Sequence, residues 1–261
     1  MTDRYHPPYH ITDEMLVLVS KITEKTSAIQ QFQNLDARPQ LRRNNRIRSI
    51  HSSLAIEANS LSLGQVKDVI NGHMVLGPAM EIQEVQNAYQ AYEKIPSINP
   101  FSLEDLMSVH EIMTHLLIRE SGTFRQGEEG VFDGDRCIFM APPARMVPQL
   151  MAELFQWMNE FKAKVHPLIL SSVFHYEFVF IHPFRDGNGR MARLWQTALL
   201  YRWKELFQYV PLDSQIQNFQ SGYYDAIAKC NAKGNSDIFI TFMLNRIDEI
   251  LEEVVKDTMV P

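Results

Sequence analysis

Cysteine is scarce in this sequence: 261 residues contain only Cys137 and Cys230. The two are far apart and form no C-x-x-C pair, which argues against a disulfide framework and against a zinc ribbon. No apolar run approaches the roughly 18 residues of a membrane-spanning helix, and the opening "MTDRYHPPYH" has no apolar signal core. These absences favour a cytoplasmic protein in a reducing compartment, with no membrane partner.

Long runs of one charge are also missing. The formal net charge is -6, with 45% hydrophobic and 21% charged residues, which is an ordinary globular balance. This composition argues against a bulk nucleic-acid or membrane-surface binder, although it leaves room for a small basic pocket. Since no internal repeat or low-complexity linker divides the chain, we expect one compact unit.

Apolar residues recur at helical spacing through most of the chain. Ser62 and Gln65 have capping-box spacing, Asn71-Gly72 is a typical helix stop, and Ser102 can cap the helix after it. The segment 209–213, "YVPLD", predicts a break. Besides the short helix after Ser62, the predicted helices cover residues 13–34, 42–58, 80–94, 103–118, 147–163, 167–181, 189–205, 218–232 and 237–256.

One region is not helical in character. Residues 119–146 are rich in glycine and proline, and "VFDGDRCIF" places Asp133-Gly134 between apolar residues, which predicts a β-hairpin over about 131–140. A lone hairpin on a helical protein would be exposed, which is unusual without a use. The predicted fold class is therefore all-α, with one short β-hairpin.

The segment 182–193, "HPFRDGNGRMAR", follows a helix that is apolar nearly all round and so is expected to be buried. Gly187, Asn188 and Gly189 can turn successive backbone amides into one concavity at the start of the next helix, a typical anion site. Arg190 and Arg193 share one face of that helix and suit phosphate groups. The segment therefore predicts a site for more than one phosphate.

Two further residues of this segment suggest chemistry. Pro183 ends the buried helix at or just before His182, whose imidazole can take a proton from a hydroxyl near neutral pH. Asp186 is explained if Mg²⁺ joins it to phosphate oxygens. Each residue alone has an ordinary structural explanation, as a helix end, turn, cap or solvated charge. All of them within twelve positions favour attack on a phosphate of a metal-bound nucleotide.

This segment resembles the H-x-F-x-[DE]-G-N-G-R-x-x-R motif of the Fic family at every defined position. The resemblance covers residues 100–245 and reaches an N-terminal element near 49–63. It implies a Fic-type helical bundle that transfers AMP from ATP, with Mg²⁺, to a hydroxyl of a target protein. Residues 1–95 would be an N-terminal helical region and residues 96–261 the Fic core, packed as one unit.

The resemblance also implies roles for the motif residues. His182 would be the general base and Asp186 the metal ligand, while Phe184 anchors the motif in the core. The phosphate-binding residues would be Gly187, Asn188, Gly189, Arg190 and Arg193.

Two other segments have counterparts in the family. The hairpin resembles the family flap, which docks the main chain of the target by strand addition, and its residues Cys137, Ile138, Phe139 and Met140 would border the nucleotide. The segment "YYDAIAKCN" resembles the adenine side of the site, with Tyr223 and Asn231. Tyr223 could equally be an ordinary core aromatic residue.

Residues 52–59, "SSLAIEAN", resemble the inhibitory-helix motif [ST]-x-x-x-E-[GN] of the family. Ser53 and Glu57 match it, within the helix predicted over 42–58, and Ala58 departs from it. Alone, Glu57 would be solvated charge. With the motif it is expected to pair with Arg193 and to take the guanidinium that the γ-phosphate of ATP needs.

Several alternatives stay open from sequence. The same residues could serve a hydrolase that removes AMP from proteins, with Glu57 orienting a water, or a nucleotide-sensing module with little turnover. His110, His115 and His175 form no metal motif and are expected in core or surface roles. The target protein is not readable from the sequence, and a homodimer is possible.

Overall fold

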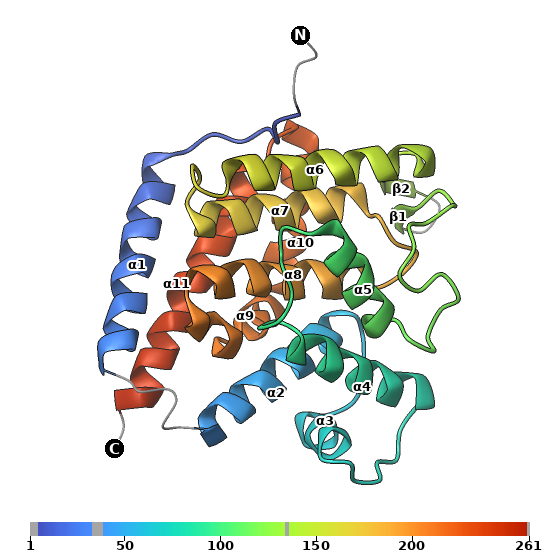
Figure 1. Ribbon diagram of the computed structural model, residues 1–261, viewed down its shortest axis with the longest axis vertical. Helices are drawn as coiled ribbons and strands as arrows, with labels where there is room; N and C mark the ends of the chain where they lie inside the picture. The colour runs from blue at the N-terminus through green and yellow to red at the C-terminus, as the bar shows by residue number, and fades with distance from the viewer. Residues whose placement is uncertain (1–4, 33–38, 134–135, 260–261) are drawn as a thin grey trace.

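The fold is helical, as predicted, with a single β-hairpin (Figure 1). A computed structural model describes residues 5–32, 39–133 and 136–259. In these ranges the helices are α1 Asp13–Phe32, α2 Pro39–Ile56, α3 Leu63–Ile70, α4 Ala79–Glu93, α5 Leu103–Met113, α6 Val147–Phe161, α7 Pro167–Ile181, α8 Asn188–Trp203, α9 Leu212–Asn218, α10 Gln220–Lys233 and α11 Asp237–Met259. The strands are β1 Gly130–Asp133 and β2 Arg136–Met140.

Helices α7 and α8 form the centre of the bundle. They pack along each other, with α6 and α11 against α7 and α1 along α11 (Figure 1). Residues 168–178 of α7 are all buried, because this helix is apolar nearly all round and has neighbours on every side. The motif segment that joins α7 to α8 is thereby fixed between two core helices.

The N-terminal helices bring a distant segment to the same place. Helix α2 packs on α4 and α9 and also contacts α8, while α3 packs on α4. Two predicted caps are confirmed: Ser62 and Gln65 form a capping box on α3, and Ser102 accepts the N–H of Asp105 on α5. The C-terminal end of α2 consequently lies beside the first turn of α8.

Three predicted boundaries differ from the structure. The helix predicted over 103–118 ends at Met113, because Leu116 takes a left-handed φ of 61° that a right-handed helix cannot continue through. The break predicted over 209–213 is shorter, since α9 begins at Leu212, directly after Pro211. Phe219 then separates α9 from α10 within the predicted helix 218–232.

The hairpin has the antiparallel pairing that its sequence predicts. Gly130 pairs with Met140, and the register shifts between Val131 and Phe132. The ring of Phe139 lies 5.5 Å from that of Phe180 on α7. The predicted turn at Gly134 lies outside the described residues.

Candidate active site

His182 lies directly after the last residue of α7. Its N–H donates to the carbonyl of Phe178 at 2.9 Å, and its backbone is left-handed, with φ 51° and ψ 60°. Non-glycine residues adopt this conformation only where their surroundings over-determine it, and they concentrate at functional sites. The helix therefore ends in a strained turn at His182.

Arg125, which the sequence analysis missed, holds this turn in place. Its buried guanidinium donates to the carbonyl of His182 at 2.7 Å, to that of Ile181 at 3.3 Å and to that of Gly127 at 2.8 Å. It also donates to the carbonyl of Pro142. No sequence pattern indicated this residue, because its partners are backbone atoms from three separate segments.

The surroundings of His182 favour the neutral form of its imidazole. Burial lowers its pKa below the usual 6.5, and this effect outweighs the opposing hydrogen bond to the carbonyl of Val179. A neutral imidazole has a nitrogen lone pair that can accept a proton.

The side chain of His182 lines a cavity of about 800 Å³, in the size range of sites for small-molecule ligands. The predicted site residues that line the cavity are Glu57, Phe139, Met140, His182, Asn188, Gly189, Arg193, Tyr223 and Asn231. Ser53, Asp186, Gly187 and Arg190 lie outside this lining. The side chains of Cys137 and Ile138 lie outside the described residues.

The loop between α7 and α8 is fixed by its own side chains. Asn188 and Phe184 exchange two hydrogen bonds, of 2.7 and 2.9 Å, and the buried ring of Phe184 stacks on His110 at 3.6 Å. His110, another residue that the sequence placed only in a general core or surface role, has its pKa lowered by burial to about 4. Its Nε2 lies 3.0 Å from the carbonyl of Asp186, so a neutral, donating tautomer fits.

Glu57 occupies the space over the first turn of α8. Its Oε1 lies 2.8 Å from Nη2 of Arg193, and a methyl group placed on Gly189 would lie only 2.2 Å from the same oxygen. A methyl group at position 189 would therefore displace the end of the Glu57 side chain. The carboxylate thus lies where the helix N-terminus attracts anions.

Arg193 has further partners that bury it almost completely, with 1% of its side chain exposed. Its Nε is 2.9 Å from Oγ of Ser53, and its Nη2 donates to the Ser53 carbonyl at 2.9 Å. Asp213, missed from sequence because it lies in the predicted break, approaches Nε at 3.5 Å and accepts from Tyr92 at 3.1 Å. Burial raises the pKa of Asp213 to about 6, although Arg193 acts in the opposite direction.

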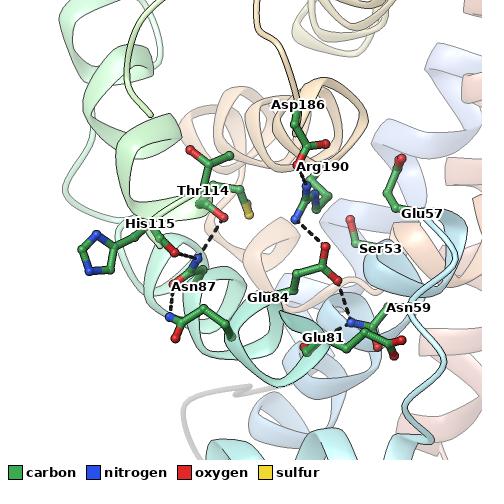
Figure 2. A network of polar contacts seen from close by, with 12 residues as sticks. Ser53, Glu57, Asn59, Glu81, Glu84, Asn87, Thr114, His115, Asp186 and Arg190 are labelled. Atoms are coloured by element: carbon green, nitrogen blue, oxygen red, sulfur yellow. Dashed lines mark hydrogen bonds and ion pairs between the residues drawn. The ribbon is translucent and has the colours of Figure 1, made fainter. Parts of the chain in front are cut away.

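Arg190 has a different set of partners (Figure 2). Its Nη2 is 2.7 Å from Oδ2 of Asp186, and its Nη1 is 3.3 Å from Oε1 of Glu84 on α4. Glu84 was not predicted from sequence, since it lies more than a hundred positions before Arg190. The two motif arginines therefore contact separate acidic residues.

Asp186 is the candidate metal ligand, and its chemistry fits that role. Nearly half of its carboxylate is exposed (48%), and among the described residues no group of three or more His, Cys, Asp or Glu could hold an ion alone. Mg²⁺ typically binds one or two carboxylates plus phosphate oxygens. Asp186 therefore fits an ion that enters together with a nucleotide.

Tyr223 and Asn231 lie on α10, on another side of the cavity. Tyr223 is buried, and its hydroxyl is 2.9 Å from Nε2 of His175, whose other nitrogen is 2.6 Å from Oε1 of Gln196. Asn231 accepts a hydrogen bond of 2.9 Å from Tyr176. Tyr223 is thus both a core aromatic residue and part of the cavity wall.

The residue after Glu57 is strained. Ala58 has φ 66°, while the N–H groups of Glu57 and Asn59 still donate to the carbonyl of Leu54, at 3.0 and 3.1 Å. A left-handed non-glycine residue costs about 1–2 kcal/mol. Glycine or asparagine would adopt this backbone more easily, which gives a physical reason for the pattern from which Ala58 departs.

Comparison with known proteins agrees with this geometry. A family model described as Fic/DOC family matches residues 100–200. The crystal structure of a Fic family protein from Desulfovibrio desulfuricans G20 superposes with a TM-score of 0.90 at 44% identity, covering 98% of this chain and 79% of that one. Fic-1 from C. elegans shares the fold, with a TM-score of 0.77 at 20% identity over 94% of this chain and 72% of that one.

Two curated relatives are named Protein adenylyltransferase Fic. The one from Aedes aegypti is 30% identical over 79% of this chain and 41% of its own length. The one from Culex quinquefasciatus is 30% identical over 89% of this chain and 46% of its own length. The chain therefore spans less than half of these two relatives.

The site and the fold together define a Fic-type helical protein. The chain belongs to the Fic family. None of the helices within residues 5–32, 39–133 and 136–259 is long and apolar enough to cross a bilayer.

Proposed function

We propose that this protein is an auto-inhibited protein adenylyltransferase, which transfers AMP from ATP to a hydroxyl side chain of a target protein. The observation that supports it most is one cavity lined by a neutral imidazole, the amide end of α8 and a buried guanidinium, at His182, Gly189 and Arg193. Attack of a hydroxyl on a nucleotide phosphate is assisted by a base that takes the proton, an anion site that binds the phosphate and a cation that neutralises its charge.

In the proposed reaction, ATP places its phosphates against the first turn of α8 and its adenine toward Tyr223 and Asn231. His182 takes the proton as the hydroxyl of the target attacks the α-phosphate and pyrophosphate leaves. Asp186 would hold Mg²⁺, which when bound neutralises phosphate charge. Arg190 and Arg193 would bind the outer phosphates.

The hairpin would supply the target site. β2 borders the cavity through Phe139 and Met140, and an extended segment of the target could pair with this edge by main-chain hydrogen bonds. Such pairing reads little side-chain sequence, so the target itself is unspecified.

Glu57 would keep the enzyme inactive. Its carboxylate lies over Gly189 and pairs with Arg193, so a phosphate oxygen cannot take that place while Glu57 remains there. Since 35% of the Glu57 side chain is exposed, it can leave without opening the core. We also propose the matching division of labour, with residues 1–95 as the regulatory region and residues 96–261 as the transferase core.

The test is transfer of labelled AMP from ATP, with Mg²⁺, to the protein itself or to lysate proteins. Glu57→Gly should raise labelling about tenfold or more, the scale of one lost site-to-site coupling. His182→Ala should lower it by a factor on the order of 10² to 10⁴. Labelling that survives unchanged in His182→Ala would overturn the assignment of the base.

A second reaction shares the site, because Glu57 and His182 line the same cavity and could orient a water. A hydrolase would release AMP from an adenylylated protein and would lose this activity in Glu57→Gly. Loss of release, in place of gain of labelling, would therefore favour removal of AMP over transfer.

A further inference from the structure

Glu84 lies between two parts of the site that are distant in sequence (Figure 2). One carboxylate oxygen, Oε1, is 3.3 Å from Nη1 of Arg190 in the motif. The other, Oε2, accepts a hydrogen bond of 2.8 Å from Nδ2 of Asn59, two residues after Glu57. A single side chain of α4 thus joins the first motif arginine to the segment that positions Glu57.

The turn 57–61 needs support from outside itself. Ala58 has a left-handed backbone, which persists only where neighbouring contacts over-determine it. Asn59 is buried, and its Oδ1 accepts the N–H of Leu61 at 3.1 Å. Its donor group, Nδ2, bonds the Glu84 carboxylate and the carbonyl of Glu81 at 3.2 Å. Asn59 is therefore one of the residues that fix the turn to α4.

Helix α4 itself is well placed to hold the turn. Asn87 donates to the carbonyl of His115 at 2.7 Å and to that of Met113 at 3.3 Å, which fixes α4 to the end of α5 (Figure 2). Glu81 accepts both the N–H and the hydroxyl of Ser60, at 2.6 and 2.7 Å. Glu84 lies one turn further along α4. It contacts both the turn, through Asn59, and the motif, through Arg190.

We propose that Glu84 is a positioning residue that couples Arg190 to the turn 57–61 and thereby holds Glu57 over Gly189. This rests on the proposed inhibitory role of Glu57. A carboxylate shared by a cation and an amide loses part of its support when either partner leaves. Binding of phosphate by Arg190 therefore weakens the hold on Asn59, and release of the turn frees Arg190 for phosphate, as reciprocal coupling requires.

The experiment uses two single variants and their combination. Glu84→Gln keeps the shape and removes the charge, while Asn59→Asp keeps the Oδ1 acceptor and places a second carboxylate against Glu84. The combined variant restores one donor and one acceptor across the contact. Glu249→Gln, which removes the carboxylate of the 2.6 Å pair with Arg246 on α11, is the matched control.

The first readout is hydrogen exchange of the Ser60 and Leu61 amides, which does not depend on any catalytic activity. Exchange should speed up in Glu84→Gln, speed up more in Asn59→Asp, and return toward the wild-type rate in the combined variant. Glu249→Gln should leave it unchanged. Unchanged exchange in both single variants, or no recovery in the combined variant, would overturn the coupling.

The second readout is AMP labelling at varied ATP concentration. Glu84→Gln should lower the apparent KM for ATP about fivefold, near the low end of typical coupling between sites, with little change in kcat. In the Glu57→Gly background neither single variant should lower KM further, and an equal decrease there would contradict the proposal. If no variant, Glu57→Gly included, shows AMP labelling, the proposed transferase function fails. The hydrogen-exchange result would still decide whether Glu84 couples Arg190 to the turn 57–61.

Discussion

The segments that follow α7 and α2 have similar left-handed backbone geometry, but different kinds of contact hold them in place. Each helix ends at a non-glycine residue with positive φ, His182 at 51° and Ala58 at 66°, and each turn presents a functional side chain to the cavity. The end of α7 is held by the buried Arg125, which bonds backbone carbonyls alone. The end of α2 is held by contacts of Asn59 and Ser60 with the partly exposed carboxylates of Glu84 and Glu81.

This difference separates a fixed part of the site from a part that can move. Backbone carbonyls bonded to a buried guanidinium cannot exchange partners at low cost. The carboxylates of Glu57 and Glu84 at the turn 57–61 are partly exposed, with 35% and 22% of their side chains accessible to solvent. The same strained conformation therefore fixes the proposed base at one helix end and supports the proposed inhibitory residue, Glu57, at the other.

The largest expected effect comes from breaking the fixed end. Arg125→Met should lower the free energy of unfolding by about 3 kcal/mol, because several buried carbonyls lose their donor. Thermal denaturation measures the loss, and Arg145→Met, at an exposed arginine, is the control. If the free energy of unfolding decreases no more than in the control, Arg125 does not stabilise the turn at the end of α7.

The next effect tests the close approach of Glu57 to α8. Gly189→Ala should destabilise the protein by about 1 kcal/mol, at the low end of the range for overpacking, because the added methyl displaces the flexible end of Glu57 from Arg193. In the Glu57→Gly background the same substitution should cost markedly less. Equal costs in the two backgrounds, measured by denaturant unfolding, would show that the contact does not limit this position.

A smaller effect should come from relaxing the movable end. Ala58→Gly removes left-handed strain of about 1 kcal/mol, which favours the inhibited conformation, although added freedom in the unfolded chain offsets part of the stability gain. AMP labelling by the otherwise wild-type protein should fall about threefold, and the Glu57→Gly variant should not respond. Increased labelling would contradict the strain argument.

The smallest effect is the pH response of the fixed end. Because burial holds the pKa of His182 below 6.5, more than half of the imidazole is still neutral at pH 6.5. The kcat/KM of Glu57→Gly, which follows the pKa values of the free enzyme, should therefore fall less than about twofold between pH 7.5 and 6.5, and more steeply only at lower pH. A decline that begins above pH 7 would show a raised pKa and would count against the proposed environment.

The sequence predicted the helical class, the hairpin and the length of α7 because these follow from local patterns. Apolar residues all round 167–181 predict a buried helix, and Pro183 sets its end. The early end of α5 could not be predicted in this way, because the carbonyls of Met113 and His115 bond Asn87 of α4, a contact that has no local pattern. The start of α9 was missed since its buried polar residues, Asp213 among them, give no helical period.

The same limit applies to the site. His182 and Arg193 belong to one contiguous segment, and the spacing of Ser53 and Glu57 resembles a known motif, so sequence indicated all of them. Arg125 and Glu84 reach the motif segment across more than fifty positions of sequence. Such partners have no local pattern, so only the folded arrangement identifies them.

Arg125 also bears on which hydroxyls could react. It bonds the carbonyls of Gly127 and Pro142, just before β1 and just after β2, as well as that of His182. The hairpin and the base are thereby held at a constant separation. A polypeptide paired with β2 would present its side chains at a set depth, so we expect side-chain length to decide whether serine, threonine or tyrosine is modified.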